Sequence, residues 1–278
     1  MQGSGFVSIL LIIANTIISY KGFTNETFLD GYKFEVDKIL INKDYKRLIS
    51  SGFLHVSWKH LIFNMFSLFV FSSLVEGDLG AVKFLVIYFA SLIGGNLLSL
   101  FVHRHHGDYS AVGASGAVCG IIFASIALFP GMGIGFFIFI PAWLYGILYI
   151  AYSIYGIRSK KDNIGHEAHL GGALIGMLTA ILLEPTAFVE NYITILIILI
   201  PSILFIYLII TKPHLLLVDN LFFNKHTDRY SIDHQYNAER NLIQQQIDRI
   251  LDKISRHGMN SLTKKEKEQL KEYSKTVR

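Results

Sequence analysis

Seven stretches of mainly apolar residues approach the length that a helix needs to cross a lipid bilayer, and they decide what this chain can fold into. A spanning helix takes about 20 such residues, because hydrocarbon offers no water to the backbone N–H and C=O groups. Only 17% of the residues are charged, against about 25% in soluble domains. We therefore predict an all-α, multi-pass membrane protein. The predicted spans are residues 5–20, 56–75, 83–102, 112–129, 133–155, 167–184 and 192–211.

The composition becomes polar after the last span. We expect a membrane domain at residues 1–211, with a core at about 5–185 and an extra span at 192–211, followed by a mainly helical tail at 212–278. Apolar residues recur at helical spacing from Leu242 to Ile254, and a capping-box pattern at Thr263 predicts the start of a second tail helix. A net charge of +4 gives no dense basic patch, so nucleic acid is not an expected partner. The tail's own partner is not readable from these residues.

One serine, Ser115, stands in the small-residue stretch 113–120, inside a run that carries no charged residue from Tyr109 to Ile157. Ser115 lies among small residues, and such a stretch allows close helix packing in which a hydroxyl bonds across the interface. The alternative is that Ser115 is a nucleophile, which requires a neighbouring base to take its proton. The second interpretation therefore depends on a base elsewhere in the chain.

Span six supplies a candidate base. His169 lies one turn from Gly172, which forms with Gly176 a G-x-x-x-G face for close helix packing. Spans alternate in direction, so the starts of spans two, four and six lie at the same surface. This places His169 and Ser115 at the same depth as a third polar pair, His60 and Asn64, which lie four residues apart on one helix face. Polar clusters at one level within a membrane predict a shared, water-accessible cavity.

These motifs together resemble the rhomboid family of intramembrane serine proteases. The chain matches its G-x-S-G at 113–116, its A-H-x-x-G-x-x-x-G at 168–176 and its H-x-x-x-N at 60–64, in family order. The resemblance implies a six-helix transmembrane core, here with a seventh helix, that cleaves transmembrane segments of other proteins in the lipid bilayer. It implies no metal and no cofactor.

The resemblance also assigns roles to residues. Ser115 is then the nucleophile and His169 its general base and acid, a dyad without a carboxylate. His60, Asn64 and the backbone N–H of Ser115 stabilise the oxyanion. The residues that pack around the dyad are Gly113, Gly116, Cys119, Gly172 and Gly176.

The chain departs from the family pattern at two positions. The loop before span two carries Lys46 and Arg47 where the family has Trp-Arg. Cys119 stands four residues after the serine, where an aromatic residue that packs on the catalytic histidine is frequent. A thiol orients an imidazole less firmly than a ring does, so the departure at Cys119 affects the expected rate.

Other functions remain open. An inactive rhomboid-like protein would bind transmembrane segments without cutting them, but both dyad residues are present here. A histidine-rich transporter or metal-binding channel would explain the histidines but not the G-x-S-G. Its candidate ligands are His103, His105, His106, His166 and His169.

Residues 1–20 have no positively charged start and no clear cleavage site, so we interpret them as a retained span. We expect a multi-pass protein of a cell membrane, specifically a bacterial inner membrane. Its orientation stays open. Eleven of the twelve Lys and Arg before residue 212 lie on the predicted catalytic side, which the positive-inside rule places in the cytoplasm, whereas the family's site faces outward.

Overall fold

The computed structural model describes residues 5–134, 139–159 and 164–211, and in the tail residues 247, 250–255, 258–263, 265–267, 269–270 and 273. The chain divides into two compact units, Met1–Asn224 and Lys225–Arg278, called here the membrane unit and the tail unit. The predicted domain boundary at residue 211 falls where the continuous description ends, and it stays a proposal.

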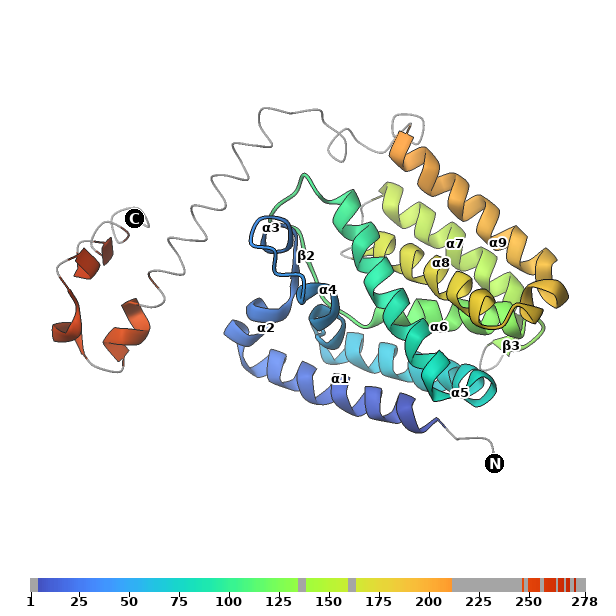
Figure 1. Cartoon of the computed structure of the whole chain (residues 1–278), viewed down its shortest axis with the longest axis horizontal. Helices are drawn as coiled ribbons and strands as arrows, with labels where there is room; N and C mark the ends of the chain where they lie inside the picture. Colours follow the sequence, from blue (N-terminus) through green and yellow to red (C-terminus); the bar gives the residue numbers. More distant parts are fainter. Residues whose placement is uncertain are drawn as a thin grey trace. The chain divides into compact units, whose positions relative to one another are not determined.

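The membrane unit is mostly helical, with two pairs of two-residue strands in its loops (Figure 1). The elements are α1 (Phe6–Thr24), α2 (Glu26–Tyr32), β1 (Phe34–Glu35), α3 (Val36–Leu40), α4 (Arg47–Ser50), η1 (Ser51–Phe53), α5 (Trp58–Val102), β2 (Ser110–Ala111), α6 (Ser115–Leu128), β3 (Gly133–Ile134), β4 (Ile140–Pro141), α7 (Ala142–Ser159), α8 (His166–Leu183) and α9 (Thr186–Thr211).

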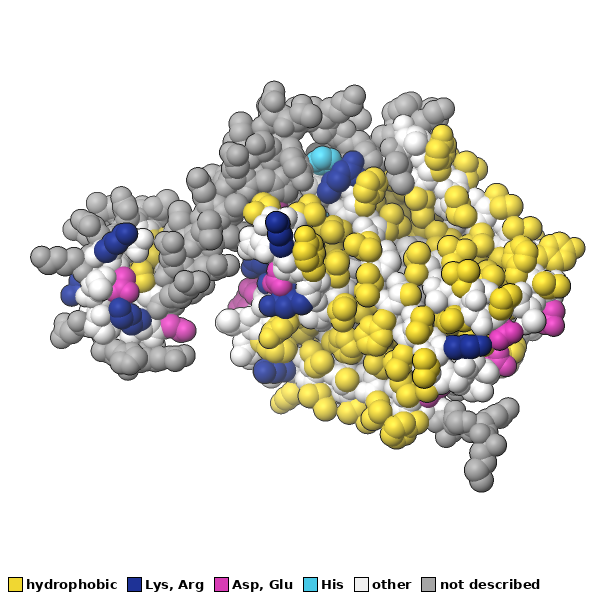
Figure 2. Space-filling model, in the orientation of Figure 1, with side chains coloured by type: hydrophobic (Ala, Val, Ile, Leu, Met, Phe, Trp, Pro, Cys, Tyr) yellow, Lys and Arg dark blue, Asp and Glu magenta, His cyan; other side chains and the backbone are white. Residues whose placement is uncertain are grey.

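Several of these helices suit a bilayer. Among the described residues, α1, α5, α8 and α9 are long and apolar enough to cross a membrane, whereas α6 and α7 contain shorter apolar stretches. Apolar side chains also cover much of the outer face of this unit in Figure 2, and Phe63 and Leu182 are 74% and 79% exposed. These features support an all-α membrane protein. The layout of six helices plus one stays a prediction.

Helix α5 covers the second and third predicted spans in 45 residues and changes direction at Gly80. Gly80 has φ 81° and ψ 165°, a conformation that a residue with a Cβ rarely adopts. Figure 1 shows the two halves of α5 meeting there and running in different directions. The backbone conformation of this one glycine therefore separates the two apolar halves of α5.

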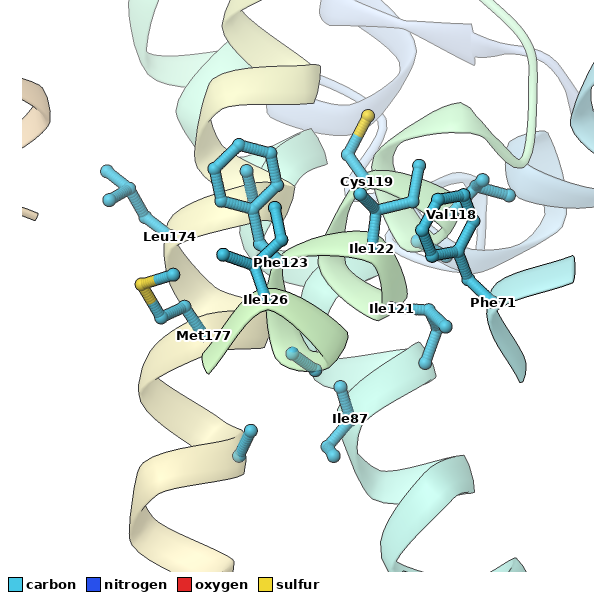
Figure 3. Packing of buried hydrophobic residues seen from close by; sticks show 14 of the residues in the cluster. Phe71, Ile87, Val118, Cys119, Ile121, Ile122, Phe123, Ile126, Leu174 and Met177 are labelled. Carbon is cyan, nitrogen blue, oxygen red and sulfur yellow. The ribbon is translucent and has the colours of Figure 1, made fainter. Parts of the chain in front are cut away.

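Helix α6 lies at the centre of the membrane unit. Every residue from Gly116 to Ala127 is buried, and α6 packs mainly against α5 and α8. Figure 3 shows Ile121, Ile122 and Ile126 of α6 among the apolar side chains of α5 and α8. A helix that is apolar on all sides is buried in this way, and Ser115 is its first residue.

Two glycines bring α8 against α6. A Cβ on Gly172 would collide with the carbonyl oxygen of Gly116, and a Cβ on Gly176 would collide with the backbone of Gly120. The two backbones are therefore closer than any side chain between them would allow. The predicted G-x-x-x-G face packs on the serine helix itself.

Helix α7 starts later than predicted. The fifth span was expected from residue 133, but residues 133–134 pair with 140–141 as β3 and β4, and the helix begins at Ala142. Pro141 explains this start, because proline lacks an N–H and is tolerated at a helix beginning but not in its interior.

The loop between α1 and α5 folds into short helices and joins the serine segment. Phe34 and Glu35 pair antiparallel with Ala111 and Ser110, just before α6. Arg47 is buried and donates to the carbonyl oxygens of Asp30 and Lys33, at 2.9 and 2.7 Å. This loop therefore supports the approach to Ser115.

The tail unit has a small apolar cluster of its own, formed by Ile247, Ile250 and Leu262. The predicted capping box forms at Thr263: its N–H donates to Glu266 Oε2 at 2.7 Å, and its Oγ1 accepts the Glu266 N–H at 3.3 Å. A short 3₁₀ helix, η4 (Met259–Ser261), precedes it. Leu242 and Ile243 lie outside the described residues.

Candidate active site

Ser115 is the first residue of α6, and its hydroxyl lies beside an imidazole from α8. The distance from Ser115 Oγ to His169 Nε2 is 2.7 Å. Both residues are half-buried. The serine donates its proton to Nε2 when that nitrogen carries none, which is the arrangement of a nucleophile and its base. The two residues that the sequence predicts as a dyad therefore lie within hydrogen-bond distance.

The other side of the imidazole faces α7. His169 Nδ1 lies 3.2 Å from the hydroxyl of Tyr149, and this hydroxyl lies 2.8 Å from Cys119 Sγ. Tyr149 is not among the site residues predicted from the sequence. Four tyrosines recur at three- or four-residue spacing along α7, so nothing in the sequence marks one of them as facing the site.

Cys119 is not placed against the histidine as expected. It is one turn beyond Ser115, but its sulfur contacts Tyr149, and Tyr149 makes the contact with His169. Figure 3 shows this sulfur pointing away from Ile121 and Ile126. The aromatic neighbour that residue 119 lacks is supplied by a different helix.

The predicted oxyanion residues lie on the other side of the serine. Gly113 has φ +141°, and a Cβ there would stand 2.9 Å from His60 Cε1 and 3.5 Å from Ser115 Oγ. The His60 ring and the serine hydroxyl therefore flank the same space. Asn64 is buried, and its Nδ2 donates one hydrogen to the His60 carbonyl at 3.0 Å.

His55 is a second residue that the sequence analysis missed. Its Nε2 accepts the Ala114 N–H at 3.4 Å, directly before Ser115, and its Nδ1 lies 2.8 Å from Ser19 Oγ in α1. Burial, reinforced by neighbouring His60, lowers the pKa of His55 to about 3. His55 is therefore neutral at physiological pH and can accept at Nε2 while it donates from Nδ1.

The histidines of the transporter hypothesis do not gather into one cluster among the described residues. His103 Nε2 lies 2.7 Å from the carboxylate of Glu167, which also accepts the Tyr109 hydroxyl at 2.8 Å. Burial and the Glu167 charge raise the pKa of Tyr109, so this phenol stays a donor. His105 is exposed. In the part of the chain that the structure describes, no three His, Cys, Asp or Glu side chains are grouped as a metal site requires.

Comparison with known proteins identifies related chains. The model of the rhomboid domain matches residues 42–186, and a family of unknown function matches residues 230–276 in the tail. RHOMBOID-like protein 12, mitochondrial, of Arabidopsis thaliana is 29% identical over 60% of this chain and 55% of its own length. Rhomboid protein 1, mitochondrial, of Saccharomyces cerevisiae is 32% identical over 53% of this chain and 45% of its own length. Rhomboid protease GluP of Bacillus subtilis is 27% identical over 63% of this chain and 33% of its own length.

These relatives correct one expectation. The Arabidopsis and yeast proteins are mitochondrial by name, so the expected bacterial inner membrane is wrong and the comparison points to a mitochondrial membrane. A multi-pass membrane protein remains supported. The chain spans between a third and just over half of the length of these three relatives. The rhomboid domain match covers just over half of the chain, and this chain therefore belongs to the rhomboid family.

Proposed function

We propose that this protein is an intramembrane serine endopeptidase that hydrolyses peptide bonds in transmembrane segments of other membrane proteins. The observation that carries the proposal is the 2.7 Å distance between Ser115 Oγ and His169 Nε2. Ser115 is the nucleophile, and His169 is the general base and then the general acid. A Bacillus subtilis relative that is a protease by name supports the same reaction class.

The first half of the reaction transfers an acyl group to the serine. Ser115 Oγ forms a bond to the scissile carbonyl carbon while its proton passes to His169 Nε2. The imidazolium then gives this proton to the amide nitrogen as the C–N bond breaks. Water attacks the resulting ester, and His169 takes a proton from the water and returns it to Ser115 Oγ as the carboxyl product leaves.

The start of α6 provides the electrostatic part of the proposal. The first N–H groups of a helix have no partner within it and carry a partial positive charge. Ser115 is the first residue of α6, so its N–H is one of these groups. The His60 ring and the Ser115 hydroxyl both border the space beside Gly113. Donors placed there stabilise negative charge on the carbonyl oxygen as the tetrahedral intermediate forms.

The substrate class follows from the position of the site and from the family. Rhomboid proteins act on transmembrane substrates within the bilayer. The site of this chain lies among helices with apolar outer faces, so a peptide bond reaches Ser115 from a membrane segment. The second half of the reaction also needs water at Ser115, which is half-buried and not fully enclosed.

Two other functions remain to be separated from this proposal. An inactive rhomboid-like protein would hold transmembrane segments without cleaving them, and the paired Ser115 and His169 argue against it. A histidine-based transporter would not need a serine at hydrogen-bond distance from an imidazole. Sensitivity of the activity to EDTA distinguishes the transporter or metalloprotein from the serine protease.

Cleavage by purified protein tests the proposal. The protein, reconstituted in liposomes, should cut a generic single-span substrate at one position, and Ser115→Ala and His169→Ala should each abolish cleavage. Ser125→Ala is the matched control, because Ser125 is a buried serine of the same helix whose hydroxyl donates to Ile121 O at 2.9 Å. A wild type that binds but never cuts substrate would favour the inactive relative, and equal rates for Ser115→Ala and wild type would refute the dyad.

A further inference from the structure

We propose that Tyr149 of α7 is a positioning residue for His169, which it holds in the tautomer that leaves Nε2 free to act as a base. This inference rests on the proposed function. The Tyr149 hydroxyl lies 3.2 Å from His169 Nδ1, on the side of the ring opposite the serine. The family pattern in the sequence would place an aromatic neighbour at residue 119, which is a cysteine here.

The hydrogen-bond distances to Ser115 and Tyr149 indicate where the imidazole proton lies. A neutral imidazole donates from one nitrogen and accepts at the other. If Nε2 accepts the Ser115 proton, the ring proton is on Nδ1 and donates to the Tyr149 oxygen. The same bond becomes stronger when the ring gains a second proton during catalysis, because a charged donor makes a stronger hydrogen bond.

Cys119 completes the series of hydrogen bonds. Since the Tyr149 oxygen accepts from His169, its own proton is free to donate, and Cys119 Sγ lies 2.8 Å away. Cys119 is 4% exposed, so it offers this acceptor without competition from bulk water. Each group then donates a hydrogen bond to the next, from Ser115 to His169, from His169 to Tyr149 and from Tyr149 to Cys119.

Ring packing holds Tyr149 in place. The rings of Tyr149 and Tyr145 are stacked with centroids 6.0 Å apart, and Phe123 of α6 meets Tyr149 edge-on at 5.7 Å. These neighbours orient the phenol toward Nδ1 and limit its alternative positions.

A neutral phenol suits this location. A buried carboxylate in the same place would require desolvation of a full charge, which is costly in a membrane interior. A phenol oxygen accepts the Nδ1 hydrogen bond without that penalty. This chain can therefore order its histidine with a third residue while the site stays uncharged at rest.

The first test removes only the hydroxyl. Tyr149→Phe keeps the ring and should lower kcat about ten- to a hundredfold, the loss of one hydrogen bond to a charged group, with little change in KM. Tyr155→Phe is the matched control, because it removes a hydroxyl from a tyrosine of the same helix that is 58% exposed, and it should cut at the wild-type rate. A Tyr149→Phe protein that cuts as fast as wild type would overturn the inference.

The second test observes the tautomer without relying on cleavage. With ¹⁵N-labelled histidine, the His169 signal is identified by its loss in His169→Asn, and its shifts report which nitrogen carries the proton. Wild type should carry it on Nδ1, and Tyr149→Phe should shift population toward the proton on Nε2. If Tyr149→Phe leaves the His169 tautomer unchanged, the inference is overturned, whether or not the wild type cleaves substrate. If the wild type is inactive, the proposed function is refuted, and the tautomer measurement still tests the inference.

A double-mutant cycle tests the role of Cys119. Cys119→Ala removes the acceptor for the Tyr149 proton and should lower kcat several-fold in the wild-type background. It should have no further effect on Tyr149→Phe, because the hydroxyl that it serves is then absent. If the kcat losses of the two single variants multiply in the double variant, Cys119 and Tyr149 act independently, and the hydrogen-bond series is overturned.

Discussion

Ser19 of α1 and His55 are joined by a 2.8 Å hydrogen bond between Oγ and Nδ1, and both side chains are buried. Ser19 Oγ also lies 3.0 Å from the Phe53 carbonyl, so the hydroxyl accepts from the histidine and donates to the backbone. The other nitrogen of His55 accepts the Ala114 N–H next to Ser115. This bond links the first helix to the start of the serine helix, outside every motif that the sequence analysis used.

The neutral state of His55 predicts a pH-dependent stability. Its folded pKa is about 3, and the unfolded side chain has the ordinary value of 6.5. Between these values the unfolded chain binds a proton that the folded chain does not, so the contribution is fully present above pH 6.5 and is lost as the pH falls. The free energy of unfolding should decrease by about 2 kcal/mol between pH 7 and pH 5.

Thermal unfolding in detergent checks this prediction at pH 7.5, 6 and 5. His55→Asn should have a lower Tm at pH 7.5 and a flatter dependence on pH than wild type. His105→Asn serves as the control, because His105 is an exposed histidine in the loop after α5. Parallel pH curves for wild type and His55→Asn would contradict the assignment.

The sequence was sufficient to predict the apolar helices and the meeting of Ser115 with His169. The reason is that a span of about 20 apolar residues is a local property, and alternating spans place the starts of even-numbered ones together. The serine and histidine also sit beside small residues whose spacing indicates close packing. These signals need no knowledge of long-range side-chain contacts.

The contacts around the dyad could not be predicted in this way. Tyr149 faces His169 because of how α7 is rotated, and four tyrosines recur at similar spacing along that helix, so the pattern does not single out Tyr149. His55 lies in a loop whose position depends on the short helices before it. The pairing of Phe34 with Ala111 involves two residues per strand, which is too short for an alternating pattern to appear.

Glu76 should stabilise the first turn of α1. Its two carboxylate oxygens accept the N–H groups of Val7 and Ser8 at 2.9 and 3.0 Å, and the side chain is 4% exposed. Glu76→Gln keeps the shape but turns an NH₂ group toward a backbone donor. We expect it to lower the free energy of unfolding by about 1–3 kcal/mol.

Chemical or thermal unfolding of the two proteins in the same detergent measures this difference. Asp78→Asn is the control, since Asp78 is an exposed acid two residues away and should change stability by less than about 0.5 kcal/mol. Equal losses for both variants would mean that general charge, and not the helix cap, is responsible.

Gly176→Ala should force α8 away from α6. The new methyl group would collide with the Gly120 backbone, which cannot move as a flexible side chain can. Overpacking of this kind costs about 1–3 kcal/mol or more. The dyad should also separate, so a fluorophosphonate, which phosphonylates an activated serine with loss of fluoride, should label Ser115 more slowly. Gly77→Ala is the control, because a Cβ there meets nothing within 4 Å.

His60 and Asn64 should act on the transition state and not on the fold. The His60 ring borders the space beside Ser115 Oγ at Gly113, and Asn64 holds the His60 carbonyl at 3.0 Å. Removing one oxyanion donor elsewhere costs about 3–4 kcal/mol of transition-state stabilisation. Here the Ser115 N–H remains, so His60→Ala and Asn64→Ala should each lower kcat by about 10- to 1,000-fold with little change in KM.

The two substitutions also differ in a way that separates direct from indirect action. Asn64 already uses one amide hydrogen on the His60 backbone, so Asn64→Ala removes both the proposed oxyanion donor and a support for His60. If the two residues act together on one oxygen, the double variant should lose less than the product of the single losses. Both single variants should melt within a few degrees of wild type. Unchanged kcat in both would reduce the pair to helix packing, and a raised KM at constant kcat would place them in ground-state substrate binding instead.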